Sequence, residues 1–112
     1  MRFRARVRTN HVAGVMNKLE AAYSSYLDLL VTGGDVHDYK FEGIKLKLAD
    51  RTTYSPDFLV IMKDGTVELH ETKGYWEDDA RVKIKVAASL FPYFIFRGIT
   101  RSKGAWVKED FK

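Results

Sequence analysis

Hydrophobic and polar residues follow their clearest pattern in the middle of the chain, where they predict a β-hairpin. Residues 58–62 (Phe-Leu-Val-Ile-Met) form an apolar, β-branched run that is typical of a buried strand. Residues 63–65 (Lys-Asp-Gly) contain Asp-Gly, a strong turn signal. Polar and apolar residues alternate from 66 to 73, so odd-numbered side chains share one face of a second strand.

The length of the turn decides which residues of this hairpin face one another. A three-residue loop with Gly65 in the left-handed conformation would place Asp57 directly opposite Glu71. Lys73 would then lie two residues further along the same face. A two-residue loop would shift the register and move Asp57 to the other face, so the two carboxylates meet only if the loop has three residues.

Weaker patterns extend the prediction to both sides of the hairpin. Apolar residues at helical spacing predict a helix over residues 11–31, which a Gly-Gly pair ends. Residues 38–48 fit one strand whose apolar phase slips near Gly43, which indicates a bulge. The remaining expected elements are a helix at 77–90 and strands at 93–96 and 105–108. With a parallel crossover through the second helix, the fold class is α/β (α+β), a mixed sheet flanked by helices.

Composition narrows the class of protein. The chain has 112 residues, of which 46% are hydrophobic, and this is enough for one packed core. Cysteine is absent, which excludes disulfides and a thiolate zinc site, and the three histidines do not cluster as a zinc site would require. Because we recognise neither a membrane span nor a signal peptide, we expect a cytoplasmic protein without a membrane partner.

The first ten residues differ from the rest in their charge pattern. We expect a basic arm at 1–10 and a single domain at 11–112, with a net charge of +4 that is compatible with a polyanionic partner. Basic and apolar residues alternate in the arm, and its arginines are Arg2, Arg4, Arg6 and Arg8. They could bind along DNA phosphates, or their charge could protect an edge strand from aggregation, and the sequence favours neither interpretation.

Asp57, Glu71 and Lys73 are the residues best suited to chemistry. Mg²⁺ takes oxygen ligands and keeps several waters, so one or two carboxylates suffice to hold it. Such an ion polarises a phosphate and lowers the pKa of a bound water, and a lysine can neutralise the charge that develops on the phosphate. The structural alternatives are that Asp57 only caps a turn, Glu71 is solvated, and Lys73 pairs with Glu71 at the surface.

Taken in order, the motifs resemble those of the PD-(D/E)xK nuclease superfamily. They are Asn-x-x-Glu-x-x-Tyr (17–23), Phe-Glu (41–42), Tyr-x-Pro-Asp-Phe (54–58), Glu-x-Lys-Gly (71–74) and Lys-x-Lys (83–85). More narrowly, the chain looks like the small phage endonucleases related to Holliday-junction resolvases. Each motif is weak alone, and the resemblance rests on their joint order and spacing over residues 17–96.

The resemblance implies a restriction-endonuclease-like αβββαβ core with its site on the second and third strands. The implied catalytic residues are Glu20, Asp57, Glu71 and Lys73. The implied ligands of Mg²⁺, for which Mn²⁺ can substitute, are Asp57, Glu71, the backbone carbonyl of Thr72 and, for a second ion, Glu20. The alternative for Glu20 is an ordinary solvated glutamate on the expected first helix.

The expected function is therefore that of a metal-dependent endodeoxyribonuclease that hydrolyses DNA phosphodiester bonds. Its implied substrate is branched or duplex DNA, in the cytoplasm of the host cell if a phage encodes the protein. A chain this small suits a homodimer, in which two sites could make paired nicks. Two alternatives stay open: a catalytically inactive nucleic-acid-binding module on a nuclease fold, and a phage protein that binds a host protein.

Several further residues have two interpretations each. Lys83 and Lys85 lie two apart on the expected second helix, so one could face the DNA backbone while the other is solvated. Glu42 is a rival acid beside the expected bulge, without an assigned role. Tyr75 and Trp76 could stack on an unpaired base, although packing in the core at the start of the helix is favoured.

Overall fold

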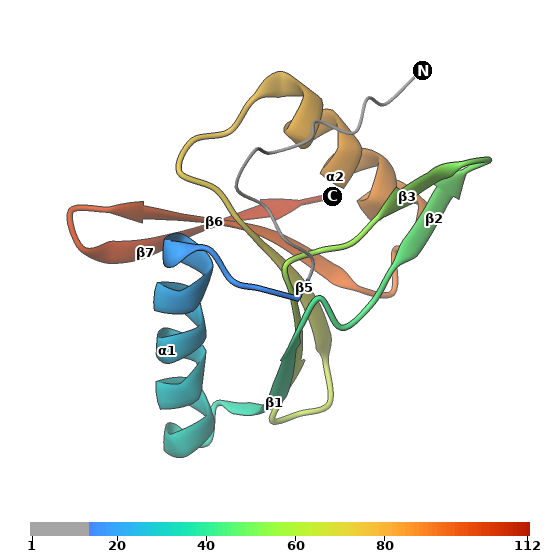
Figure 1. Cartoon of the computed structure of the whole chain (residues 1–112). Coiled ribbons are helices and arrows are strands. Elements are labelled where there is room, and N and C mark those ends of the chain that lie inside the picture. Colours follow the sequence, from blue (N-terminus) through green and yellow to red (C-terminus); the bar gives the residue numbers. More distant parts are fainter. Residues whose placement is uncertain (1–13) are drawn as a thin grey trace.

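A computed structural model of the chain describes residues 14–112 (Figure 1). Residues 1–13 lie outside the described part. The predictions for the basic arm at 1–10, and for the arginines that it carries (Arg2, Arg4, Arg6 and Arg8), therefore stay predictions. The first residues of the helix expected at 11–31 are also outside the described range.

The described chain is an α+β fold built on a five-stranded mixed sheet with the strand order β1-β4-β5-β6-β7. These strands are β1 (Val36–Phe41), β4 (Phe58–Met62), β5 (Val67–Thr72), β6 (Ile95–Ser102) and β7 (Ala105–Phe111). The helices are α1 (Lys18–Gly33) and α2 (Asp78–Leu90). Strand β5 runs parallel to β6, while the other neighbouring pairs of this sheet are antiparallel. The expected mixed sheet flanked by helices is confirmed.

The hairpin of β4 and β5 has the three-residue loop that brings the acids together. Phe58 pairs with His70, so the ladder has the register that places position 57 opposite position 71. Gly65 has a φ of 89°, in the left-handed region where glycine carries no steric cost. The Met62 amide donates to the carbonyl of Thr66 at 2.8 Å and closes the loop.

The single strand expected over 38–48 is wrong, because the chain breaks there into two strands of different sheets. Strand β1 ends at Phe41, and Glu42 adopts a φ of 51°. Strand β2 (Leu46–Ala49) then pairs with β3 (Thr52–Tyr54) in a separate two-stranded ribbon. Phe41 packs on the side of α1 and Leu46 on the side of α2, so the slip in the apolar phase reflects a change of layer, not a bulge.

Helix α1 starts later than residue 11, at Lys18, because Asn17 is its N-cap. The Asn17 side chain accepts a hydrogen bond from the Glu20 amide, and Glu20 Oε1 accepts one from the Asn17 amide, both at 2.8 Å. This reciprocal capping box satisfies two amides at the helix start. At the other end, the helix runs to Gly33, two residues beyond the expected end, and Gly34 of the expected Gly-Gly pair adopts a φ of 89° as the left-handed cap.

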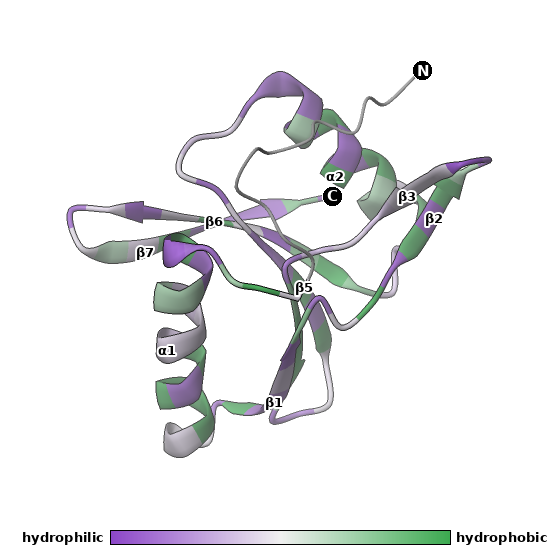
Figure 2. Cartoon of the chain, viewed as in Figure 1, coloured by the Kyte–Doolittle hydropathy of each residue, from purple (hydrophilic) through white to green (hydrophobic). Residues whose placement is uncertain are grey.

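The remaining elements are close to their predictions, but both C-terminal strands are longer. Helix α2 begins at Asp78 behind its N-cap Glu77 and ends at Leu90, as expected. In Figure 2 its first turn is hydrophilic, which reflects the acids there. Strand β6 continues to Ser102 and β7 to Phe111, because the two pair along their whole length as an antiparallel hairpin.

Two apolar clusters hold the helices against opposite faces of the sheet (Figure 1). Tyr23 and Leu27 of α1 pack with Phe58 and Val60, whereas the α2 side buries Leu69 with other residues. Further members of the α2 side are Leu46, Leu48, Tyr54, Ile84, Ala87, Ala88, Phe96 and Phe111. Because both faces of β5 are covered, every residue from Glu68 to Thr72 is buried despite its polar sequence.

None of the helices described between residues 14 and 112 is long and apolar enough to cross a membrane.

Gly98 of β6 is expected to tolerate no side chain. A Cβ atom built there would lie 2.6 Å from Cζ2 of Trp76 and 2.8 Å from Cε2 of Phe111, two rings that pack on each other. Gly98→Ala should therefore lower the free energy of unfolding by about 1–3 kcal/mol, the usual cost of overpacking. Urea denaturation measures this, with Gly33→Ala at the open end of α1 as the control. Equal stability of the two variants would contradict the packing described.

Candidate functional site

Asp57 and Glu71 come together where β4 begins and β5 ends. The Asp57 amide donates a hydrogen bond to Glu71 Oε1 at 3.1 Å, and both residues are buried, at 8% and 9% exposure. Pro56 before them is fully buried, which fixes the backbone that leads into β4. The hairpin register thus delivers two acids to one buried place.

Protein groups hold each carboxylate in one orientation. Asp57 Oδ2 accepts hydrogen bonds from the amide and the hydroxyl of Thr72, at 2.8 and 2.9 Å. Glu71 Oε1 also accepts one from the Tyr54 hydroxyl, at 3.2 Å, while Oε2 forms an ion pair with Lys73 Nζ at 3.4 Å. Asp57 Oδ1 has no hydrogen-bond donor among residues 14–112 and remains available for a ligand.

The electrostatics of this pair favour a cation or a proton between the acids. Burial raises the pKa of Asp57 well above its ordinary value, and the charges of Glu71 and Glu20 raise it further, against the Thr72 hydrogen bonds. Burial also raises the pKa of Glu71, and the charge of Lys73 opposes that shift. Two buried carboxylates that lie close together gain stability from any positive ion that both can reach.

Glu20 is the third acid of this region and is completely buried. Its Oε1 completes the capping box of α1, but its Oε2 has no hydrogen-bond partner in the described part of the chain. A buried hydrogen-bond acceptor without a partner lowers the stability of the fold by about 1–3 kcal/mol. A bound cation would supply the partner that Glu20 Oε2 lacks. The solvated helix glutamate that the sequence left open as an alternative is excluded.

The carboxylate oxygens of this region suit Mg²⁺ better than a metal ion that takes all of its ligands from the protein. Within residues 14–112, no group of three or more acids and histidines is arranged to enclose a metal. Mg²⁺ needs no such cage, because it keeps several waters and is commonly held by one or two carboxylates. The free Oδ1 of Asp57 and the orphan Oε2 of Glu20 are hard oxygen donors of the required kind.

Three neighbours of the acids have roles that sequence reasoning missed. The amide and hydroxyl of Thr72 donate hydrogen bonds to Asp57, which the sequence did not indicate. The expected role of the Thr72 carbonyl as a metal ligand stays a prediction. Tyr54 orients Glu71 from β3. Glu42 binds the Gly14 amide through Oε2 at 3.1 Å and donates its own amide to the Asp57 carbonyl at 2.7 Å. The Tyr-x-Pro-Asp motif was the available signal for Tyr54.

The two lysines of α2 differ in their surroundings. Lys83 is partly buried and its ammonium lies 5.7 Å from the centre of the Tyr54 ring, beside the acid pair. Lys85 is exposed. Of the two aromatic residues after Lys73, Trp76 packs against Phe111 in the core, as favoured, whereas Tyr75 is 75% exposed.

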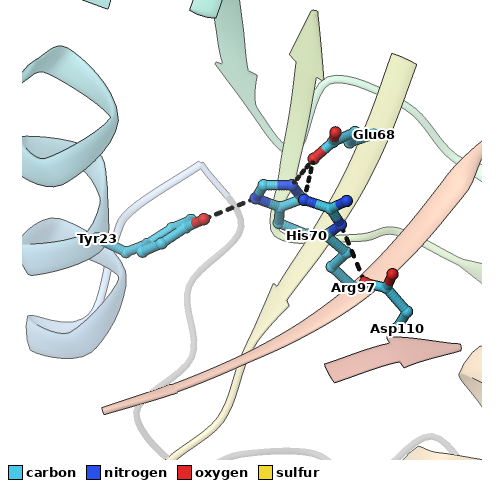
Figure 3. A network of polar contacts seen from close by, with 5 residues as sticks. All are labelled: Tyr23, Glu68, His70, Arg97 and Asp110. Carbon is cyan, nitrogen blue, oxygen red and sulfur yellow. Dashed lines mark hydrogen bonds and ion pairs between the residues drawn. The ribbon is translucent and has the colours of Figure 1, made fainter. Parts of the chain in front are cut away.

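A second polar cluster lies on the opposite, α1-facing side of β5 (Figure 3). His70 accepts a hydrogen bond from the Tyr23 hydroxyl at Nδ1, at 2.7 Å, and donates from Nε2 to Glu68 Oε1 at 2.8 Å. Arg97 of β6 forms ion pairs with Glu68 at 3.2 Å and with Asp110 at 3.0 Å. The network links α1 to β5, β6 and β7.

Burial keeps His70 neutral. Burial lowers the pKa of His70, and the Glu68 carboxylate only partly offsets this. Burial alone would raise the pKa of Glu68, but the His70 hydrogen bond and the charge of Arg97 hold it below its ordinary value. The network therefore assigns the proton of the neutral imidazole to Nε2. Sequence reasoning gave His70 no role, because nothing in the sequence marks its distant partners.

Tyr23→Phe should lower the free energy of unfolding by about 1–3 kcal/mol, because His70 Nδ1 would lose its donor in a buried place. The matched control is Tyr26→Phe on the same helix, whose hydroxyl makes no hydrogen bond in the described part of the chain. Chemical denaturation of both variants makes the comparison. Equal losses would mean that the Tyr23 hydroxyl contributes nothing specific.

Comparison of the chain with protein-family models, with curated proteins and with solved structures found no match. The geometry of the site and the motifs in the sequence are therefore what indicates a function.

Proposed function

We propose that the protein is a metal-dependent endodeoxyribonuclease of the PD-(D/E)xK kind. The observation that carries the proposal is the meeting of Asp57 and Glu71 across the hairpin, with Lys73 in an ion pair at the same place. An acid pair buried at the end of two paired strands has no evident structural purpose, because burial and the charge of Glu71 both disfavour the ionised form of Asp57. A hydrolytic metal site explains why the fold keeps them together.

The order of elements is compatible with this proposal. Helix α1, strands β1, β4 and β5, helix α2 and strand β6 follow one another as an αβββαβ series, and the candidate acids lie on the second and third of these sheet strands. In this view the β2–β3 ribbon is an insertion between the first two strands, and β7 is an addition at the edge.

Each residue has a defined part in the proposed site. Asp57 and Glu71 would hold Mg²⁺, with the Thr72 carbonyl as a further ligand and Glu20 available to a second ion. When bound, the ion would polarise the scissile phosphate and make a bound water more acidic. Lys73 brings a positive charge to the place where negative charge develops on the phosphate.

The hydrogen bonds around the acids keep this arrangement preorganised. The amide and hydroxyl of Thr72 hold one oxygen of Asp57 and leave Oδ1 free. The Tyr54 hydroxyl holds Oε1 of Glu71, so Oε2 faces Lys73. The Asp57 carboxylate fixed in this way needs no reorganisation when a cation arrives, which is how neighbouring groups tune a metal site.

We further propose branched DNA as the substrate and a homodimer as the active form, acting in the cytoplasm. The substrate and the dimer follow from the resemblance to junction resolvases and from the small size of the domain. The protein would recognise the shape of the DNA and its phosphates, because no helix or strand of the described chain is recognisable as one that contacts base edges.

One cleavage experiment tests the proposed function. Purified protein is incubated with a four-way junction, a matched linear duplex or single-stranded DNA, each with Mg²⁺, Mn²⁺ or EDTA. Cleavage of the junction with either metal and none with EDTA is the expected result, and size-exclusion chromatography with light scattering gives the oligomeric state. DNA binding without cleavage under any condition would favour the inactive binding module, and neither binding nor cleavage would favour a protein-binding role.

A further inference from the structure

Lys83 stands in an unusual position for a helix lysine. It lies on α2, the helix that covers the face of the sheet carrying Glu71, and its ammonium is placed over the ring of Tyr54 at 5.7 Å from the centroid. Tyr54 is buried and donates its hydroxyl hydrogen to Glu71. The ring therefore forms a platform whose face meets Lys83 and whose hydroxyl reaches the acid pair.

The charge of Lys83 is not neutralised within the described chain. Burial lowers the pKa of Lys83, the nearby charge of Glu71 opposes this, and the charge of Lys73 adds to the lowering. Lys73 has its ion-pair partner in Glu71, but no carboxylate among residues 14–112 lies within ion-pair distance of Lys83. Two ammonium groups thus flank one acid pair, and only one of them has an anionic partner.

Lys85 provides the contrast on the same helix. Two residues along a helix turn a side chain by more than half of a full rotation, so Lys83 and Lys85 face different directions. Lys85 is exposed, and water solvates its charge. The two lysines of the Lys-x-Lys motif therefore have different surroundings, although the sequence alone could not distinguish them.

We infer that Lys83, and not Lys85, contacts a backbone phosphate of DNA beside the acid pair. The inference rests on the proposed function, because it takes DNA to be the ligand. A phosphate would supply the anionic partner that Lys83 lacks. The platform formed by Tyr54 would hold the long lysine side chain in place before DNA binds, which reduces the entropy lost on binding.

The test is the salt dependence of DNA binding in EDTA, so that neither metal nor cleavage is involved. Lys83→Met keeps the apolar stem over Tyr54 and removes only the charge, and Lys85→Met is the matched control. Binding of a fluorescent four-way junction is followed by anisotropy at several salt concentrations. For Lys83→Met we expect the slope of log affinity against log salt to fall by about 0.9 and the affinity at about 0.1 M salt to fall about tenfold.

Lys85→Met should keep the wild-type slope, and Lys83→Arg should restore it, because arginine also pairs with phosphate. A mere packing role for Lys83 would leave the slope unchanged in Lys83→Met and would overturn the inference. Equal losses in Lys83→Met and Lys85→Met would also overturn it, since they would indicate a diffuse basic surface.

The experiment separates this inference from the proposed nuclease function. If wild-type protein cleaves the junction but Lys83→Met keeps the full slope, the inference fails and the nuclease stands. If wild-type protein never cleaves DNA but the slope falls as expected, the nuclease proposal fails and Lys83 remains a phosphate contact. Absence of DNA binding by the wild type overturns the inference as well.

Discussion

Asp57→Asn is expected to lower the rate of Mg²⁺-dependent DNA cleavage by about 10³-fold or more. The substitution removes the carboxylate whose Oδ1 is free for a ligand, while asparagine can still accept the two Thr72 hydrogen bonds. A catalytic metal stabilises the transition state by several kcal/mol, and about 1.4 kcal/mol corresponds to each tenfold of rate. Single-turnover cleavage of the junction measures the loss.

The same substitution should make the metal-free protein more stable, because a buried like-charge pair disappears. Burial and the neighbouring acids raise the pKa of Asp57 in the folded state. As the pH rises above about 4, Asp57 ionises in the unfolded chain but stays protonated in the folded protein. The free energy of unfolding of the wild type therefore falls with pH until the pH reaches the raised pKa of Asp57. Asp57→Asn should lose less stability over that interval, as thermal melts in EDTA would show.

A matched control is Asp64→Asn, at the exposed turn of the same hairpin. Its side chain accepts a hydrogen bond from the Thr66 amide, which asparagine can also do. This variant should cleave DNA at the wild-type rate. Full activity in Asp57→Asn, or an equal loss in Asp64→Asn, would remove Asp57 from the proposed site.

Phe58→Ala should be strongly destabilising, with a loss of about 3–5 kcal/mol in the free energy of unfolding. The Phe58 ring is fully buried and contacts the rings of Tyr23, Tyr39 and Phe41. It joins α1 to the sheet directly beside Asp57, so the cavity would also loosen the part of the fold that positions Glu20. Domains of this kind are stable by about 5–15 kcal/mol, which makes the loss a large share.

The control for Phe58 is Phe58→Leu, which keeps most of the apolar volume and should cost about 1.5 kcal/mol or less. Urea denaturation of both variants gives the difference in their free energies of unfolding, provided that the slope of this free energy against urea concentration is the same in both. Similar losses in the two variants would mean that the site is not packed as tightly as the ring contacts indicate.

The site could be predicted from sequence where it depends on local rules. Asp-Gly in the turn predicted the hairpin but left its loop at two or three residues, and the structure has three. The three-residue loop sets the register, and the register brings Asp57 to Glu71. The lysine that follows on the same face is then placed by the alternation of a strand alone. The Asn17 cap is equally local, but the sequence prediction began this helix at residue 11 and missed the capping box with Glu20.

The rest depends on packing between distant segments, which the sequence does not encode locally. The ring of Tyr54 meets Lys83 only because the β2–β3 ribbon and α2 share one apolar cluster. His70 meets Tyr23 only because α1 lies across β5. The slip near Gly43 was visible, but a slip in phase cannot distinguish a bulge from a strand that leaves the sheet.

The most direct test of the central claim, that the buried acids form a divalent-cation site, is the effect of Mg²⁺ on thermal stability. This measurement does not depend on choosing the right DNA. At about 100 times the dissociation constant, bound Mg²⁺ should stabilise the wild type by about 2.7 kcal/mol, or about 10 °C or more in Tm. Asp57→Asn should show almost no shift. Equal shifts in the two proteins, or no shift of the wild type with Mg²⁺ or Mn²⁺, would contradict the claim.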